Sequence, residues 1–516
     1  MKQFYKPFLI ASLFIGTLSM NSCVELEPMD YAEINPSIFP NTEADIESLV
    51  NASYYSVRAS WFDGLFATSE RGVTVVNDLT TEILSCKSGF LKDISDLNYF
   101  PTTADLTRFY YTNTDAYSDG WVNDVSRCTT TLQDIAQSGF LSEEKKLRYE
   151  AEVRCARALI SYTLYDMFGP IVVAPIEVLE NPIVEQPLPR LTQEEMVNFI
   201  REDLEFAATH LPTPAEAEYG RFSQGLAKML LIRLYLHETP TDLANYEQVE
   251  ALARELMDSS HGYRLASSYT AMFELDGQGK SNPEIIWAIP VALEQISWND
   301  WHMFTLANNF ADHGMQSGYE SVNSTWAFYD SFEPDDVRKT YLVASYIDNT
   351  GQVVDRQNPG THLDVGPIPM KYGYDPNVTG NGGKSTIDPI IYRYADVYLS
   401  LAEALYRKPG STTADKEEAL RLINEIRNRA QLDDLSMADI QTEEQFIEVL
   451  LKERCHEFWC ENGQYRADLI RLGKFVEHAR DIKGTSYAED YKKLYPLPLA
   501  AINDGKGLVL QNDGYN

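Results

Sequence analysis

The chain has 516 residues, with 43 Lys and Arg against 77 Asp and Glu, which gives a formal net charge of −34 at pH 7. This excess of negative charge excludes nucleic acid as a natural partner and disfavours long acidic polysaccharides, unless a local basic pocket overcomes the repulsion. The six cysteines have neither zinc-ribbon nor knottin spacing, so a large hydrophobic core must hold the fold together.

The N-terminus has the pattern of a secretory signal. Lys2 and Lys6 precede an apolar run over residues 8–20, and small residues then lead to Cys23. The run is shorter than the roughly 20 residues that a transmembrane helix needs. Cys23 is therefore predicted to be the acylation site of a bacterial lipoprotein, although the residues before it depart from the usual lipobox. The alternatives are a retained anchor and an ordinary cleaved signal.

Three regions follow from this interpretation. Residues 1–22 are the predicted signal peptide, and residues 23–42, which begin with an acidic and unpatterned stretch, are a tether between the lipid and the folded body. Residues 43–516 are expected to form a single domain.

Hydrophobic periodicity predicts long helices along this domain. Between Ser142 and Gly169, apolar residues recur at steps of three and four, and Gly169-Pro170 ends the pattern. A helix over about 122–137 is expected to pair with this one through a short loop. The other predicted helices cover residues 194–211, 223–236, 246–257, 394–405 and 419–430.

The spacing of these helices predicts a mainly α fold. Helical hairpins in series form a scaffold that approximates the 34-residue tetratricopeptide repeat, although the match to that consensus is poor. Residues 259–388 have little periodicity and are rich in Gly, Asn, Asp, Pro and aromatic residues. They are expected to form a loop-rich insertion packed on the helices.

A series of motifs in chain order resembles one family of known proteins. The motifs are Phe-Gly at 168–169 before a Pro-containing strand, Asn-Pro-Glu-Ile-Ile-Trp at 282–287, Tyr-Arg-Tyr-Ala-Asp from 392, Ile-Asn-Glu-Ile-Arg-Asn-Arg from 423, and Leu-Tyr-Pro-Leu-Pro at 494–498. With these motifs the chain resembles the SusD/RagB family of nutrient-binding lipoproteins. It departs from the family at Cys455-His456, where arginines are usual.

The resemblance implies a fold, a cellular location and a partner protein. It implies the SusD-like α/α superhelix, a lipid anchor in the outer membrane, exposure at the cell surface, and no cofactor. The implied function is to bind glycans, without catalysis, and to deliver them to a SusC-like TonB-dependent transporter. The acidic stretch after Cys23 is similar to surface-export signals of such lipoproteins. The alternatives are the same fold binding peptides, a surface glycoside hydrolase, and a helical adaptor without a small ligand.

Charged residues in the C-terminal third are expected to build the fold. They lie among apolar helix residues, where charges persist when they pair with one another or cap backbone carbonyls. This group comprises Glu453, Arg454, Glu457, Arg466, Asp468 and Arg471. Just before them, Thr442 and Gln445 have the spacing of a capping box, which predicts a helix start.

Motifs of catalysis are scarce. The run from His456 to Cys460 contains the first half of a zinc-protease helix but lacks the second histidine, which argues against a metal site. The sequence contains no Gly-x-Ser-x-Gly motif and no Walker loop. A glycosidase needs only two suitably spaced carboxylates, and no motif marks such a pair.

The candidate ligand site consists of aromatic residues in polar loops. Sugars offer apolar faces for stacking and hydroxyls for amides, carboxylates or arginine. Trp298 and Trp301 lie in a polar stretch with Asn299 and Asp300 between them, and are predicted to carry the ligand.

A second group of candidates lies mainly in the N-terminal region. Trp61 and Phe62 are further candidate aromatic contacts, although Trp61 could instead end the first helix. Arg71 and Asn77 could bind hydroxyls, because the resemblance implies that this region lies beside the ligand face. Tyr319 is an additional candidate.

The variant Cys23→Ala is expected to lose membrane retention while its body stays folded, because residues 24 to about 40 form only a tether. A multiply acylated cysteine would hold the chain on a membrane, since each buried methylene contributes about 0.8 kcal/mol. Metabolic labelling with a fatty acid measures the modification. A mature wild-type chain without label contradicts the lipoprotein assignment.

Overall fold

The computed structural model describes residues 39–61, 64–87, 89, 91–110, 120–181, 183–184, 186–292, 297–310, 318–373, 375 and 384–515. The predicted signal peptide, Cys23 and most of the predicted tether lie outside these ranges, as does Phe62.

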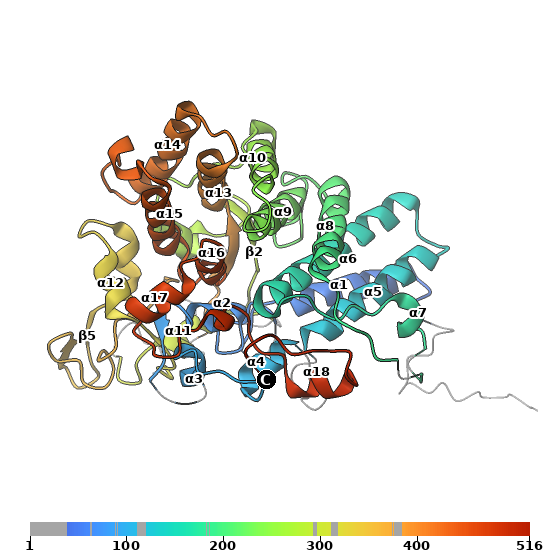
Figure 1. Cartoon of the computed structure of the whole chain (residues 1–516), viewed down its shortest axis with the longest axis horizontal. Coiled ribbons are helices and arrows are strands. Elements are labelled where there is room, and N and C mark those ends of the chain that lie inside the picture. Colours follow the sequence, from blue (N-terminus) through green and yellow to red (C-terminus); the bar gives the residue numbers. More distant parts are fainter. Residues whose placement is uncertain are drawn as a thin grey trace, which may run out of the picture.

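Paired helices form the larger part of the molecule (Figure 1). The long helices are α1 (Glu43–Ser56), α5 (Trp121–Gln137), α6 (Glu143–Phe168), α8 (Gln193–His210), α9 (Gln224–Glu238), α10 (Asn245–Leu256), α13 (Tyr394–Arg407), α14 (Thr413–Arg429) and α15 (Glu443–Phe458). Neighbouring helices pack together in the order α5, α6, α8, α9, α10, α13 and α14. The predicted mainly α scaffold is confirmed.

Shorter elements complete the scaffold and fill the segment between α10 and α13. The short helices are α2 (Val73–Asp78), α3 (Leu91–Ser95), α4 (Ala104–Tyr110), α7 (Ile176–Leu179), α11 (Trp301–Thr305), α12 (Trp326–Ser331), α16 (Tyr465–Arg471), α17 (Phe475–Asp481) and α18 (Leu499–Asp504). Because α10 packs directly on α13, the chain leaves the helical stack after α10 and rejoins it at α13.

Within the described residues, the strands form two-stranded antiparallel pairs. These are β1 (Leu84–Ser85) with β3 (Asn323–Ser324), β2 (Ile285–Ala288) with β8 (Ile390–Arg393), β4 (Leu342–Val343) with β7 (Ile368–Pro369), and β5 (Ser345–Ile347) with β6 (Val353–Asp355). The β2–β8 pair joins residues 285–288, within the segment 259–388, to the strand that leads into α13.

Local sequence signals set the ends of the helices. Ser142 accepts a hydrogen bond from the Lys145 backbone N–H at the start of α6, and Gly169 ends this helix with φ +75°, which favours glycine. The capping box of Thr442 and Gln445 is confirmed at the start of α15. A similar box at Thr412 makes α14 begin before the predicted apolar face.

Asp468 of α16 is the centre of a buried charge cluster. Its carboxylate oxygens accept hydrogen bonds from the guanidinium groups of Arg233 at 2.8 Å, Arg454 at 2.6 Å and Arg471 at 2.8 Å. All four side chains are almost fully buried. Burial alone would raise the pKa of Asp468, but the three guanidinium groups hold it well below its usual range. Arg471 also contacts Glu403 of α13, so the cluster joins α9, α13, α15 and α16.

A second buried cluster, around Arg393 of β8, joins the scaffold to the chain between α10 and α13. The Arg393 guanidinium contacts Glu284 at 2.9 Å, Glu457 at 2.5 Å and Glu461 at 2.8 Å. Lys371 contacts Glu461 at 2.9 Å. The predicted structural role of the C-terminal charges agrees with these contacts.

Arg466 is a buried charge that caps backbone carbonyls, the second arrangement expected from the sequence. Its guanidinium donates to the backbone carbonyls of Lys492 at 3.1 Å and Lys493 at 2.8 Å. Arg466 thereby fixes the chain that follows α17.

The variant Arg471→Ala is expected to lower the free energy of unfolding by about 3–5 kcal/mol, because it leaves the buried carboxylates of Glu403 and Asp468 with one cation fewer. Chemical denaturation followed by circular dichroism measures the change. The matched control is Arg421→Ala, which removes an exposed pair with Glu425 and should cost less than about 1 kcal/mol. Full stability of Arg471→Ala together with lost ligand binding contradicts the structural assignment.

Candidate functional site

Trp61 and Tyr319 come from distant parts of the chain and meet beside α11. Their ring centroids are 5.4 Å apart at 72°, in an edge arrangement. Tyr319 is 62% exposed, and Trp61 is half-buried. Phe304 of α11 is fully buried, and its ring lies 6.0 Å from that of Trp61. The Trp61–Tyr319 pair therefore offers aromatic surface to solvent while its inner side rests on the core.

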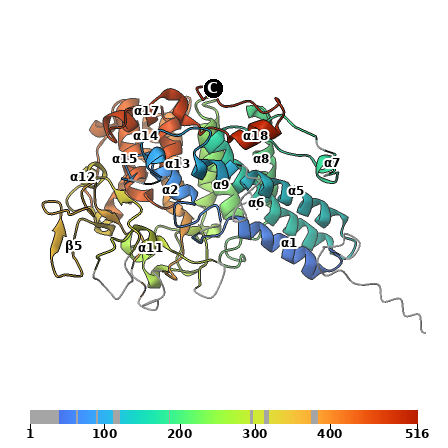
Figure 2. The same cartoon turned by 90° about the horizontal axis from the view of Figure 1, so that it is seen from below.

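Backbone hydrogen bonds join the segment after α1 to the segment before α11. The Trp298 N–H donates to the Ala59 carbonyl at 3.2 Å, and the Asp300 N–H donates to the Thr68 hydroxyl at 2.8 Å. Figure 2 shows α11 at the edge of the molecule opposite α17 and α18. The segments that carry Trp61 and Trp298 thus lie side by side.

The predicted surface positions of Trp301 and Asn299 are wrong. Trp301 is 1% exposed, and its indole N–H donates to the Pro369 carbonyl at 2.7 Å. Asn299 is also buried, because its amide donates to the Ile387 carbonyl at 3.0 Å and accepts from the Trp301 N–H at 2.9 Å. Asn299, the polar neighbour of Trp301, therefore bonds backbone groups inside the protein and does not mark a solvent-exposed loop.

Trp298 is half-buried, and one face of its ring is covered. The Lys384 ammonium lies 3.8 Å from the ring centroid, which is a cation–π contact. A sugar could stack on that face only if Lys384 moved away.

Asp300 is buried beside these two side chains. Burial raises the pKa of Asp300 to about 7, although the Lys384 cation opposes the rise. Since its side chain is only 1% exposed, the predicted direct contact of Asp300 with a ligand is contradicted.

Asn77 and Arg71 have different surroundings. Asn77 is buried in α2, and its side-chain carbonyl accepts from the Tyr495 hydroxyl at 3.2 Å, so the predicted hydroxyl contact at Asn77 is wrong. Arg71 is half-buried, with its Nε 3.9 Å from the Glu70 carboxylate. Its role in ligand binding stays a prediction.

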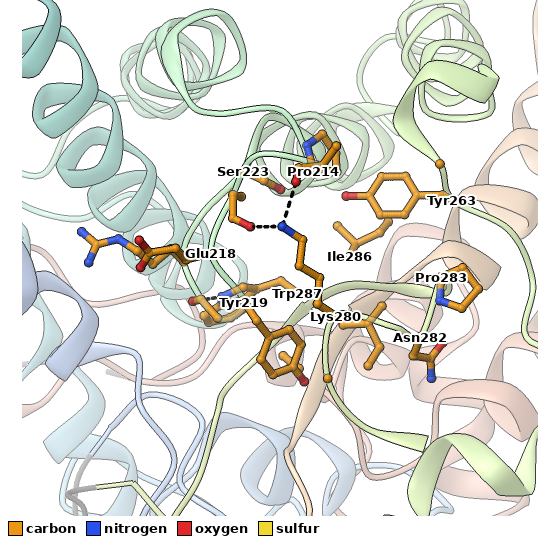
Figure 3. Close-up of a pocket in the computed structure, with 18 of the residues that line it drawn as sticks. Pro214, Glu218, Tyr219, Ser223, Tyr263, Lys280, Asn282, Pro283, Ile286 and Trp287 are labelled. Atoms are coloured by element: carbon orange, nitrogen blue, oxygen red, sulfur yellow. Dashed lines mark hydrogen bonds between the residues drawn. The ribbon is translucent and has the colours of Figure 1, made fainter. Parts of the chain in front are cut away.

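A separate cavity of about 230 Å³ lies between residues 214–223, 261–263 and 279–288 (Figure 3). The Lys280 side chain extends into it, and its ammonium donates to the carbonyls of Ala215 at 2.8 Å and Ala217 at 2.7 Å. Lys280 thus fastens the loop before α9 to the segment before β2.

Other polar groups around this cavity are also bonded within the protein. The Tyr219 hydroxyl donates to Asp388 at 2.7 Å, and the Trp287 indole N–H donates to the Gly220 carbonyl at 3.0 Å. Because these groups are committed to holding the loop, we regard the aromatic surface beside α11 as the better candidate site.

Within the described ranges, no group of three His, Cys, Asp or Glu side chains could hold a metal ion. His456, in the half-motif of a zinc protease, stacks on Phe332 with ring centroids 3.8 Å apart and hydrogen-bonds Ser331 at 2.8 Å. Burial, together with nearby cations, lowers its pKa well below the usual value. His456 is therefore a neutral core residue.

The described residues form a scaffold of paired helices, with the exposed Tyr319 and the half-buried Trp61 beside α11. Comparison with known proteins shows which family this chain resembles. The model of the SusD family matches residues 343–515. The starch-binding protein SusD of Bacteroides thetaiotaomicron is 23% identical over 100% of this chain and 99% of its own length. SusD-like protein P2 of Formosa agariphila is 23% identical over 96% and 98%.

Solved structures have the same fold. A SusD homologue from Bacteroides thetaiotaomicron superposes with a TM-score of 0.73 at 19% identity, covering 92% of this chain and 97% of that one. The surface glycan-binding protein A of Bacteroides fluxus gives 0.70 at 22% identity, covering 92% and 100%. The family model and these relatives support the resemblance to the SusD/RagB family that the motifs predicted. Proteins of this family are binding proteins and not enzymes, and they are associated with the outer membrane at the cell surface.

Sequence reasoning missed Lys384 and Phe304. Lys384 covers Trp298 from a segment far along the chain, and Phe304 supports Trp61 from below. Neither contact has a local signal, because each depends on how distant segments pack. The apolar spacing of Trp301 and Phe304 could have indicated the short helix α11.

The variant Asp300→Asn is expected to be more stable than the wild type at pH 8 and to gain less at pH 4. The folded pKa of Asp300 is raised above its ordinary value of 3.8 to about 7. The folded state therefore binds more protons, and ionisation of Asp300 lowers the free energy of unfolding as pH rises through this window. The gain at pH 8 should be a few kcal/mol at most, since one pKa unit corresponds to about 1.4 kcal/mol.

Urea denaturation at the two pH values measures this difference. The control is Asp335→Asn at an exposed position, which should show no such pH-dependent gain. Equal effects of Asp300→Asn at both pH values would mean that Asp300 ionises like an exposed carboxylate.

Proposed function

We propose that this chain is a cell-surface glycan-binding lipoprotein that delivers oligosaccharides to a SusC-like TonB-dependent transporter. The observation that carries the proposal is the Trp61–Tyr319 pair, which presents aromatic surface at one edge of the molecule. Sugar rings have apolar C–H faces that stack on aromatic rings, and a rim of hydroxyls that polar side chains bind. Arg71, in the same N-terminal region, could bind such hydroxyls.

The names of the similar proteins support a glycan as the ligand. One relative is named a starch-binding protein, and one structural neighbour a surface glycan-binding protein. SusD homologues act with a SusC-like transporter in that system, which supports the same partner here. Peptide binding remains the second candidate, because a peptide can also pack against exposed aromatic rings.

The proposed anchor is Cys23, the residue that follows the predicted signal pattern. The first described helix, α1, begins at Glu43. Among the described residues, none of the helices is both long and apolar enough to cross a membrane. In the proposed function, acylated Cys23 attaches the protein to the outer membrane.

The double variant Trp61→Ala with Tyr319→Ala is expected to weaken oligosaccharide binding by about 1–3 kcal/mol, or roughly 5- to 150-fold. The range takes aromatic pair energies as a guide for two sugar-stacking contacts. Calorimetry measures the affinity for the best ligand from a screen of starch, other polysaccharides and peptides.

The matched control is Tyr487→Ala, which removes another solvent-exposed tyrosine and should leave the affinity unchanged. If the folded Trp61, Tyr319 double variant keeps its affinity, the ligand binds at another part of the surface. Tight binding of a peptide with no glycan binding would replace the glycan proposal by the second candidate.

A further inference from the structure

Glu320, the residue after Tyr319, has a backbone conformation that side chains rarely adopt. Its φ is +52°, in the left-handed region that favours glycine. A non-glycine residue keeps such a conformation only when surrounding contacts hold it there, and such residues are frequent at functional sites. The contacts around Glu320 are therefore informative about the adjacent Tyr319.

Backbone hydrogen bonds fix this turn onto α11 and its C-terminal end. The N–H groups of Tyr319, Glu320 and Ser321 donate to the carbonyls of Met303 at 2.8 Å, Leu306 at 3.0 Å and Phe304 at 2.9 Å, respectively. The Phe304 ring also packs against Trp61. Both members of the Trp61–Tyr319 pair are therefore positioned by contacts with the short helix α11.

The Glu320 side chain is held by two basic residues from other segments. Its carboxylate accepts a hydrogen bond from His362 Nδ1 and lies 3.6 Å from the Lys87 ammonium. Lys87 also contacts Asp364 at 2.5 Å and donates to the Thr361 carbonyl. Glu320 and His362 are only 13% and 14% exposed at their side chains, so solvent screens this contact weakly.

The segment that carries His362 is itself fixed. The His362 N–H donates to the Pro359 carbonyl at 3.1 Å, and its carbonyl accepts from the Asn323 amide at 2.9 Å. Asn323 belongs to β3, which pairs with β1, and Lys87 follows β1 closely in the chain. The two basic residues thus come from segments that the β1–β3 pair holds together.

We propose that Glu320 is a positioning residue for ligand binding. The contacts of its carboxylate with His362 and Lys87, called the Glu320 clamp, hold the Tyr319 ring against Trp61 before the ligand binds. This inference rests on the proposed glycan site, and it names residues that act on the site without touching the ligand. An exposed tyrosine on a loose turn would have to be ordered during binding, which costs affinity. The clamp removes that cost in advance.

The test begins with Glu320→Ala and Glu320→Gly in the full chain, with calorimetry on the oligosaccharide identified by the screen. Both variants should weaken binding by about 2- to 13-fold, the cost of ordering one side chain. Glu320→Gly relieves the backbone strain, so its loss of affinity reports the clamp and not a misfolded turn. Glu320→Gln retains an acceptor for His362 and should restore most of the affinity.

A double-mutant cycle separates positioning from direct contact. If Glu320 acts through Tyr319, then Glu320→Ala should have no further effect on affinity in a Tyr319→Ala background. His362→Ala should reproduce the loss seen with Glu320→Ala, and the two should not add. The control is Asp330→Ala, which breaks an exposed ion pair with Arg356 in the same part of the chain and should leave affinity unchanged.

The outcomes are distinguishable. Unchanged affinity in Glu320→Ala and His362→Ala overturns the positioning role, while a loss in the Trp61, Tyr319 double variant would keep the proposed function. An equal loss from Glu320→Ala with and without Tyr319 also overturns it, because Glu320 would then contact the ligand itself. No effect from Tyr319→Ala and Trp61→Ala removes the site on which both proposals rest.

Discussion

Ion pairs sealed from water are the constraint on which the rest of this structure depends. Asp468 is shared by three arginines, and Arg393 is shared by three glutamates, at positions where solvent cannot replace a missing partner. A buried charge is costly unless all its partners are in place. The segments that supply them must therefore assemble together. The Arg393 cluster matters most for function, because Glu284 and Lys371 fasten the irregular part of the chain to the helices.

The Arg393 cluster explains how a scaffold of regular helices can hold the irregular segment that carries the proposed binding site. Trp61 follows the first helix, Tyr319 lies far along the chain, and both depend on α11 for their positions. Short helices such as α11 have little stability alone. In this protein α11 is held because Trp301 is packed in the core beneath it, with its indole N–H bonded to the Pro369 carbonyl. Trp301 thus contributes to the site by supporting it from inside.

The sequence predicted most of the long helices because apolar residues recur at helical spacing along them, and α6 also has clear end signals at Ser142 and Gly169. It also predicted Trp61 and Tyr319 as candidates. It misjudged Trp301, because a polar neighbourhood along the chain does not reveal where an indole finds its hydrogen-bond acceptor. It gave no sign of Lys384 covering Trp298, since a contact between residues so distant in sequence depends on tertiary packing.

The cysteines have a consequence for how this protein behaves outside a reducing compartment. Cys128, Cys155, Cys455 and Cys460 are buried free thiols, and burial raises the pKa of Cys128 to about 12. Only the thiolate reacts readily with oxidants or alkylating reagents. Burial raises the pKa of the thiols of Cys128, Cys155, Cys455 and Cys460, and this keeps them from reacting readily in the folded protein. A thiol reagent modifies these cysteines only when the core opens, so the rate of labelling would report directly how often the intact protein unfolds on a living cell.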